Sequence, residues 1–173
     1  MRNENSTQRN ALKSLNEASA GDACGQLLSL CESERWARTI AERRPYADSA
    51  ALLAASDDVF AELDSADVAA ALAGHPRIGD RVQGDGRSAQ LSRNEQSAMA
   101  TADATVAEQI LQGNYDYESR FDRVFLIRAA GRAPAEILAE LRRRLDNDDA
   151  AEEREVREQL RQITRLRLEG AFS

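Results

Sequence analysis

Apolar residues recur at the spacing of an α-helix along nearly the whole of this 173-residue chain. Ala11, Leu12 and Leu15 form one such stripe, and Trp36 and Ile40 belong to another. Residues three or four apart share one face of a helix, so each stripe can pack against a neighbouring helix. The chain is also rich in alanine, leucine, glutamate and arginine and has only three prolines, a composition that favours helix over sheet. We therefore expect an all-α fold, a single compact bundle of about seven or eight helices in one domain over residues 1–173.

Local signals predict where these helices begin and end. A serine or aspartate can cap the free N–H groups of a first turn, and glycine or proline ends a helix. In the first half of the chain we expect a helix over about residues 6–18, a second that carries Leu27, Leu28, Leu30 and Cys31, and a third with Trp36 and Ile40 that stops before Pro45. A further short helix or two begun by Asp48 or Ser49 should follow, and then one capped by Asp64 or Ser65 and closed by Gly74. In the second half we expect a long helix from Ser92 that Gly113 and Asn114 stop, one with Pro134 in its first turn, and a last one over about Asp149–Leu168.

Two stretches do not fit the helical pattern. Residues 77–91, RIGDRVQGDGRSAQL, contain three glycines and few apolar residues, which predicts a loop. Residues 121–131, FDRVFLIRAAG, include a β-like run at Val124–Ile127, but the chain offers no partner strand. We expect a buried irregular or extended segment there rather than a sheet.

Charge and cysteine content limit the classes of partner and compartment. The formal net charge of −7 argues against generic attraction to nucleic acid or to an anionic membrane. No segment approaches the roughly 20 apolar residues of a membrane span, and the polar start MRNENSTQRN has no apolar signal core. Cys24 and Cys31 would lie about 10 Å apart on a helix, too far for a disulfide, and reduced cysteines fit a cytosolic compartment. We expect a cytoplasmic protein that binds neither nucleic acid nor membrane.

The only histidine, His75, lies in the string AGHPRIGDR at the end of a predicted helix. An imidazole changes charge most readily near neutral pH, so His75 is a candidate general acid or base. The alternative is a surface histidine that merely follows a helix end. Gly74 and Pro76 restrict the backbone on either side of it, which favours a directed ring.

A second candidate is SRNEQ, which begins at Ser92. Ser92 and Glu95 match a capping box, in which each side chain caps a backbone N–H at the start of a helix. The same helix start could instead bind an anionic ligand, or its carboxylate could orient a histidine. Both interpretations stay open at this point.

Other classes of chemistry lack their motifs. Two cysteines and one histidine give no zinc-binding spacing, QGDGR matches no phosphate-binding loop, and no G-x-S-x-G elbow is present. Cys31 and Trp36 lie on helical stripes and are interpreted as core residues rather than as a nucleophile or a cofactor contact. The arginines at 142–144 and at 161, 165 and 167 alternate with acidic residues, which predicts solvated helix faces.

Four motifs occur in a specific order. R-P-Y at Arg44–Tyr46 is followed by H-P-x-x-G at His75, by S-x-x-E-Q from Ser92 and by F-x-I at Phe125–Ile127. In this combination the chain resembles the 2-oxo-4-hydroxy-4-carboxy-5-ureidoimidazoline (OHCU) decarboxylase family, which catalyses the last step in the oxidation of urate to allantoin. The resemblance extends through most of the chain, from LLSLCESERWARTIAERRPYAD to RQITRLRL, and implies an all-helical fold.

The resemblance also implies roles for individual residues. His75 is expected to be the catalytic proton donor and Glu95 the acid that holds and polarises it. Pro76, Ser92 and Gln96 are expected to contact the substrate. The backbone of Phe125–Ala129 is expected to line the pocket and to bind the urea-like edges of the substrate, with these positions: Phe125, Leu126, Ile127 and Ala129.

Arg167 is similar to the arginine that pairs with the substrate carboxylate, with Arg165 as the alternative register. The sequence departs from the family pattern at two positions. Asp122 stands where many relatives have glycine, and Tyr46 replaces a phenylalanine.

The reaction that the resemblance implies needs few chemical groups. Loss of CO₂ leaves an electron pair that can move to the adjacent imine nitrogen, so we expect neither a metal nor another cofactor. A positioned acid contributes on the order of 10²–10⁴ in rate, and protonation from one face sets the (S) configuration of allantoin. The resemblance suggests a homodimer, although the periodicity of this sequence requires none. Two alternatives remain: a non-catalytic helical binding module, and an enzyme of the same fold that acts on a related ureido or imidazoline compound.

Overall fold

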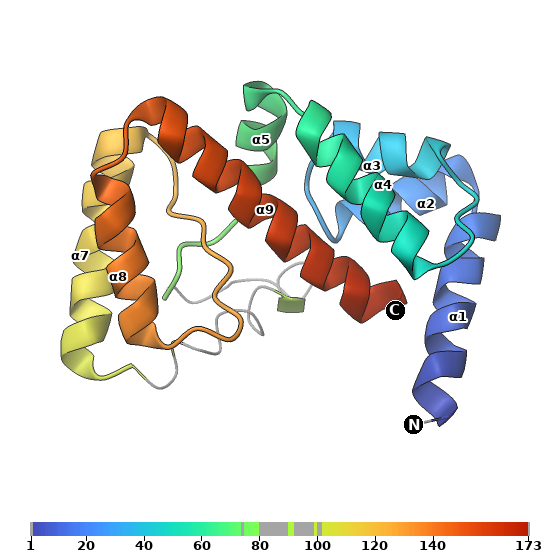
Figure 1. Cartoon of the computed structure of the whole chain (residues 1–173), viewed down its shortest axis with the longest axis horizontal. Helices are drawn as coiled ribbons and strands as arrows, with labels where there is room; N and C mark the ends of the chain where they lie inside the picture. The colour runs from blue at the N-terminus through green and yellow to red at the C-terminus, as the bar shows by residue number, and fades with distance from the viewer. Residues whose placement is uncertain (1, 74, 80–89, 92–98, 100–101, 173) are drawn as a thin grey trace. The chain divides into compact units, whose positions relative to one another are not determined.

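The computed structural model describes residues 2–73, 75–79, 90–91, 99 and 102–172, and within them it contains eight α-helices and no strand (Figure 1). This confirms the all-α prediction and its seven or eight helices. The helices are α1 (Arg2–Glu17), α2 (Ala20–Leu28), α3 (Glu34–Glu42), α4 (Ser49–Glu62), α5 (Ser65–Leu72), α7 (Ala104–Phe121), α8 (Pro134–Leu145) and α9 (Asp149–Phe172).

The chain forms two compact units. Unit 1 contains residues 1–71 and 161–173, and unit 2 contains residues 72–160. The first half of α9 belongs to unit 2 and its second half to unit 1. The single domain expected over residues 1–173 stays a prediction.

Unit 1 is built from α1–α4, most of α5 and the end of α9, and α3 packs against both α2 and α4. Of the predicted caps, the two aspartates begin their helices: Asp48 accepts a hydrogen bond from the N–H of Ala51 at 2.8 Å, and Asp64 accepts one from the N–H of Asp67 at 2.9 Å. Trp36 is fully buried, lies against Phe60 and donates from Nε1 to Ser56 Oγ at 3.1 Å, which confirms its interpretation as a core residue. The hydroxyl of Tyr46 donates to the carbonyl of Ile40 at 2.8 Å, so tyrosine is accommodated there in place of phenylalanine.

The helix predicted to contain Leu30 and Cys31 is shorter than expected. α2 ends at Leu28, and both residues follow it, buried, in a turn. The N–H groups of Leu30 and Cys31 return to the carbonyl of Leu27, so this turn satisfies the end of α2 without extending it.

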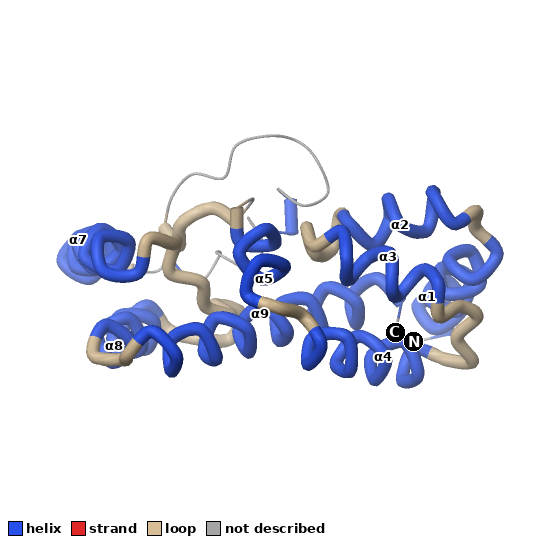
Figure 2. Tube along the Cα trace, turned by 90° about the horizontal axis from the view of Figure 1, so that it is seen from above, coloured by secondary structure: helices blue, strands red, loops and turns tan. Residues whose placement is uncertain are grey.

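In unit 2, α7 and α8 lie side by side (Figures 1 and 2). Their apolar faces form one buried cluster with the segment between them and with Ile78. The cluster consists of Ile78, Ile110, Tyr117, Phe121, Phe125, Ile127, Ala129, Ile137, Leu138 and Leu141.

The prediction of a long helix from Ser92 to Gly113 is wrong in the part that the structure describes. Ala102 and Asp103 are not helical, and α7 begins at Ala104 because Asp103 accepts a hydrogen bond from the N–H of Val106 at 2.9 Å. Residues 92–98 lie outside the described residues.

The predicted stop at Gly113 and Asn114 is also wrong, since α7 continues to Phe121. Gly113 faces α8: a Cβ at this position would lie 2.5 Å from Leu141 Cδ2. Asn114 is buried and donates to the carbonyl of Ile78 at 3.0 Å. Gly113 and Asn114 therefore serve contacts of α7 with neighbouring segments, and they do not end the helix.

The predicted loop over residues 77–91 is confirmed only at its start. Arg77–Gly79 is irregular, and Gly79 has a φ of +90° that favours glycine. Gln90 and Leu91 are helical, contrary to the prediction, and residues 80–89 lie outside the described residues, as does Gly74.

The segment that follows α7 contains no strand, as predicted, and it is buried at Phe125, Leu126, Ile127 and Ala129. It starts at Asp122, which caps α7 in the left-handed conformation (φ 52°, ψ 35°) and donates its N–H to the carbonyl of Glu118 at 2.9 Å. Glycine is the usual residue in this conformation, and aspartate is among the few others that adopt it. The departure from the family pattern at Asp122 therefore leaves the left-handed turn in place.

Candidate active site

His75 lies just beyond the C-terminus of α5, as the sequence predicted. Its N–H donates to the carbonyl of Leu72 at 2.9 Å, which continues the hydrogen bonding of the last turn of α5. The side chain is half-buried, and its Nε2 atom is buried. Pro76 follows and is also half-buried. The ring thus leaves the chain at a helix end whose backbone is restricted on its C-terminal side.

The residues after His75 are fastened to α7 by two polar contacts. Arg77 forms a two-pronged ion pair with Glu118, with Nη2 donating to Oε2 at 2.6 Å and Nε donating to Oε1. The Arg77 guanidinium also lies 5.6 Å from the centre of the Tyr115 ring. The amide of Asn114 holds the carbonyl of Ile78. Two neighbours of the histidine are therefore attached to one face of α7.

Electrostatics keep the Arg77–Glu118 pair ionised. The hydrogen bond from Arg77 lowers the pKa of Glu118 below its ordinary value of 4.5, against a smaller opposing effect of burial. The sequence by itself did not indicate this pair. Asn114 and Glu118 are four residues apart, so they share one face of α7, but nothing in the sequence connects that face to Arg77.

The predicted pocket-lining residues are all buried in unit 2: Phe125, Leu126, Ile127 and Ala129. Three of them belong to the apolar cluster that also contains Ile78, three residues after His75. The structure thus brings the histidine segment and the pocket-lining segment to the same core, although they are about 50 residues apart in the sequence.

Hydrogen bonds hold the backbone of this segment at two points. The carbonyl of Leu126 accepts from Arg144 Nη1 at 2.7 Å, and the N–H of Arg128 donates to Gln159 Oε1 at 3.0 Å. Between these points, the main-chain N–H and C=O of Ile127 make no hydrogen bond with another described residue. The donor and acceptor of Ile127 are therefore not used within the described part of the chain.

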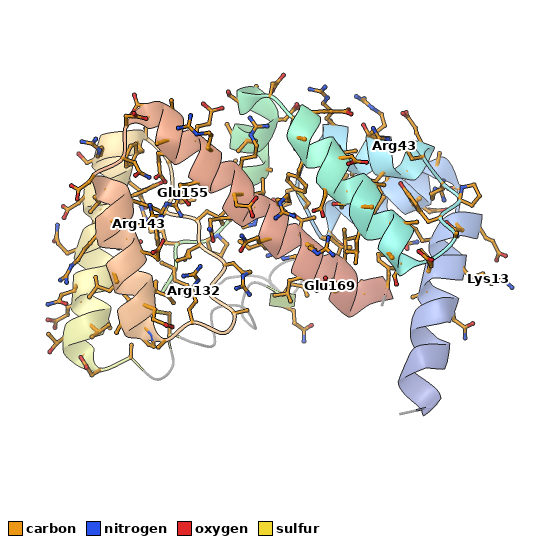
Figure 3. All side chains as sticks on the ribbon, in the orientation of Figure 1. Lys13, Arg43, Arg132, Arg143, Glu155 and Glu169 are labelled. Carbon is orange, nitrogen blue, oxygen red and sulfur yellow. The ribbon has the colours of Figure 1, made fainter. Side chains whose placement is uncertain are left out.

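Two arginines predicted to lie on solvated helix faces are buried instead. Arg144 is 1% exposed and Arg167 is 3% exposed. A guanidinium is rarely buried without specific partners, so each position calls for a structural or functional reason. The prediction holds for Arg143, which is 47% exposed and pairs with Glu155 across α8 and α9 (Figure 3).

The two candidate carboxylate-binding arginines, both in unit 1, have different surroundings. Arg165 is 40% exposed and already pairs with two carboxylates, those of Asp57 at 2.6 Å and Glu169 at 3.2 Å. Arg167 is buried and donates from Nη1 to the carbonyl of Leu30 at 3.0 Å. The ion pairs of Arg165 occupy its guanidinium, which argues against Arg165 as the carboxylate partner.

Cys31 is confirmed as a core residue. It is buried, and burial raises the pKa of its thiol to about 11 despite the opposing effects of Thr164 and Arg167. The thiol is therefore protonated near neutral pH and is not an activated nucleophile. Cys24 and Cys31 are both free thiols.

The three remaining predicted site residues, Ser92, Glu95 and Gln96, lie outside the described residues. Among the residues that the structure does describe, no group of three His, Cys, Asp or Glu side chains could hold a metal ion. None of the described helices is both long enough and apolar enough to cross a membrane.

Comparison with known proteins gives one consistent result. The family model described as OHCU decarboxylase matches residues 16–169. The uric acid degradation bifunctional protein TTL of Arabidopsis thaliana is 33% identical over 147 residues, which are 83% of this chain and 45% of that protein. A uric acid degradation bifunctional protein of Bacillus sp. (strain TB-90) is 26% identical over 164 residues, which are 93% of this chain and 32% of that protein. The chain thus spans less than half the length of either relative.

Two solved structures are similar to this fold. A crystal structure of OHCU decarboxylase in the presence of (S)-allantoin aligns with a TM-score of 0.74 at 26% identity, over 85% of this chain and 96% of that one. A crystal structure of (S)-allantoin synthase aligns with a TM-score of 0.71 at 15% identity, over 94% of this chain and 53% of that one, and shares the fold.

Proposed function

The chain belongs to the OHCU decarboxylase family, and on that premise we propose that it is a carboxy-lyase that converts OHCU to (S)-allantoin and CO₂ in urate catabolism, without a cofactor. The observation that carries the proposal is the meeting of two motifs in unit 2. The segment after His75 and the segment 125–129 enter one buried cluster, and both lie within the residues that the family model matches.

The proposed reaction requires a proton donor but no external electron acceptor. The bond between ring carbon C4 and its carboxylate breaks, its electron pair forms a C4=C5 double bond, and the imine electrons move onto the ring nitrogen. C5 then receives a proton from His75, while the C4 hydroxyl becomes a carbonyl and its proton passes to the ring nitrogen. One proton is taken up overall. Delivery of the C5 proton from one face gives the (S) product.

The other proposed roles follow from the family resemblance. Glu95 orients His75, and Pro76, Ser92 and Gln96 contact the substrate. The backbone of Phe125–Ala129 binds the urea-like edges, for which the donor and acceptor of Ile127 are suited. Arg167 clamps the substrate carboxylate with its two-pronged fork. Because too tight a clamp would stabilise the ground state, Arg167 orients the substrate rather than accelerating the loss of CO₂.

The decisive experiment follows (S)-allantoin formation from OHCU generated in situ from urate by urate oxidase and hydroxyisourate hydrolase. The wild-type protein should accelerate formation of the single enantiomer above the spontaneous racemic background. His75→Asn should remain helical and lose about 10²–10⁴ in rate, the contribution of a positioned acid. Undiminished stereospecific turnover would remove His75 from the mechanism. A wild-type protein that leaves the background unchanged would favour a binding module or another ureido or imidazoline substrate.

A matched pair of variants tests the carboxylate partner. Arg167→Ala should raise the KM, because it removes a contact made in both the ground state and the transition state. Arg165→Ala should leave the KM unchanged, since that guanidinium is paired with Asp57 and Glu169. The opposite result would assign the carboxylate to Arg165.

We further propose a cytoplasmic homodimer whose chain folds as one domain over residues 1–173. Sedimentation equilibrium should give twice the 19.0 kDa mass of one chain. A single cooperative unfolding transition supports one domain, and two separate transitions contradict it.

A further inference from the structure

Unit 2 contains a buried charged cluster that the proposed reaction does not use. Arg144 from α8 and Glu152 from the first turn of α9 form an ion pair in which both side chains are 1% exposed. Arg144 Nε donates to Glu152 Oε1 at 2.9 Å, and Nη2 donates to the same oxygen. Tyr117 donates its hydroxyl to that oxygen, and Asn147 Nδ2 donates to Oε2 at 2.8 Å. The carboxylate is therefore fully satisfied.

Arg144 also contacts the pocket-lining segment. Its Nη1 donates to the carbonyl of Leu126 at 2.7 Å, and its guanidinium carbon lies 4.7 Å from the centre of the Phe125 ring. One side of the fork thus binds Glu152 and the other binds the backbone of the segment. Glu152 anchors the guanidinium of Arg144, so the Nη1 group that donates to Leu126 has little freedom to move. The Tyr117 ring packs against Phe125, which restricts the segment on the other side of this hydrogen bond.

Stability alone does not explain this cluster. Removing two charges from water is costly, and replacing a buried ion pair by apolar residues of similar volume is often neutral or stabilising. What apolar residues cannot supply is a donor for the carbonyl of Leu126. That donor lies next to Ile127, whose own N–H and C=O make no hydrogen bond among the described residues. The cluster therefore fixes the backbone beside the groups available to a ligand.

We propose that Arg144 is a positioning residue, which uses the Glu152 anchor to hold the backbone at Leu126 so that Ile127 presents its donor and acceptor to the urea-like edge of the substrate. This inference rests on the proposed function, since it concerns the same site. Arg144 contacts neither the substrate nor the reacting atoms in this role. Its effect is on substrate affinity and on the order of the segment 125–129.

The test replaces the buried charges and leaves the fold intact. In the triple variant Tyr117→Phe, Arg144→Met and Glu152→Leu, no charged or hydroxyl group of the cluster remains without its partner. Amide hydrogen exchange at residues 125–129, measured without substrate, should become faster than in the wild type. The KM for OHCU should rise roughly two- to tenfold, the value of one hydrogen bond, while kcat changes less.

A neighbouring arginine provides the control. Arg143→Met removes ion pairs with Glu140 and Glu155 from the same helix but no contact with the segment 125–129. It should leave both the exchange rates and the KM at wild-type values. Arg144→Lys keeps a charge for Glu152 but lacks the fork, so it should give intermediate exchange rates and an intermediate KM.

The outcomes separate this inference from the proposed function. A wild-type protein without decarboxylase activity refutes the function, and the exchange measurement still tests the hold on Leu126. A folded triple variant with wild-type exchange at 125–129 and a wild-type KM overturns the inference. Should the triple variant not fold, Arg144→Lys decides: wild-type exchange and KM in that variant overturn the inference, and intermediate values support it.

Discussion

Gly113 allows a direct test of how closely α7 and α8 pack. Replacing a glycine inside a helix by alanine normally stabilises the helix by about 1 kcal/mol. At Gly113 the new Cβ would lie 2.5 Å from Leu141 Cδ2 and 3.1 Å from its Cγ. Leu141 is fully buried and cannot turn into solvent, so the overpacking costs about 1–3 kcal/mol. We expect Gly113→Ala to lower the free energy of unfolding by about 1 kcal/mol.

A second glycine and a double-mutant cycle isolate the cause. Gly25 is exposed within α2 and has no neighbouring atom within 4 Å of an added Cβ, so Gly25→Ala should stabilise by up to about 1 kcal/mol. Leu141→Ala alone should cost about 2–5 kcal/mol. In that background the methyl group of Gly113→Ala enters vacated space and should become stabilising, which gives a coupling of about 2 kcal/mol.

Urea unfolding followed by circular dichroism measures the unfolding free energies of the wild type and of the four variants. Equal changes at Gly113 and Gly25 would refute the close approach of the two helices. The same would follow if Gly113→Ala cost as much with Leu141→Ala as without it, because the clash requires the leucine side chain.

Three further predictions concern other local features. Asp122→Gly should raise the midpoint of thermal unfolding by about 2–4 °C, because glycine adopts a φ of 52° without the roughly 1 kcal/mol cost of a side chain; a lower midpoint in calorimetry would contradict this. Arg77 lowers the folded pKa of Glu118, so the stability from this pair is present above pH 4.5 and is lost as the pH falls through the folded value. The difference in unfolding free energy between wild type and Glu118→Gln should therefore shrink from pH 7 to about pH 3, and a constant difference would count against the pair. With a pKa raised to about 11, Cys31 should react with a thiol reagent at about pH 8 far more slowly in the native protein than in urea, and equal rates would exclude its burial.

The positions of most helices follow from short-range signals in the sequence. The aspartate before α4 and the proline that begins α8 act on backbone groups within one turn, so their effect is independent of distant residues. The motif at His75 is local in the same way, because a helix end and the following proline set its backbone. Such features can be predicted from a window of a few residues.

The helical spacing of α8 indicates that Arg144 is buried, but it does not indicate which residues contact Arg144. It lies three residues after Leu141 and seven after Ile137, so it shares the buried face of α8, and this spacing could have distinguished it from Arg143. Its partners, Tyr117 and Glu152, come from α7 and α9. No window of the sequence shows that they converge on one guanidinium.

Helix periodicity, caps and the ordered motifs are local or linear, and for that reason the sequence was sufficient for the all-α class, for the starts of α4, α5, α8 and α9 and for the resemblance to a decarboxylase family. Close approach between distant segments is not linear. Gly113 lies within a helix rather than at its end, and its missing side chain leaves room for Leu141, which is 28 residues later in the chain. The carbonyl of Leu126 is held because an arginine from α8 is buried beside it. Which polar groups are satisfied, and which stay available at Ile127, depends on packing that exists only once the chain has folded.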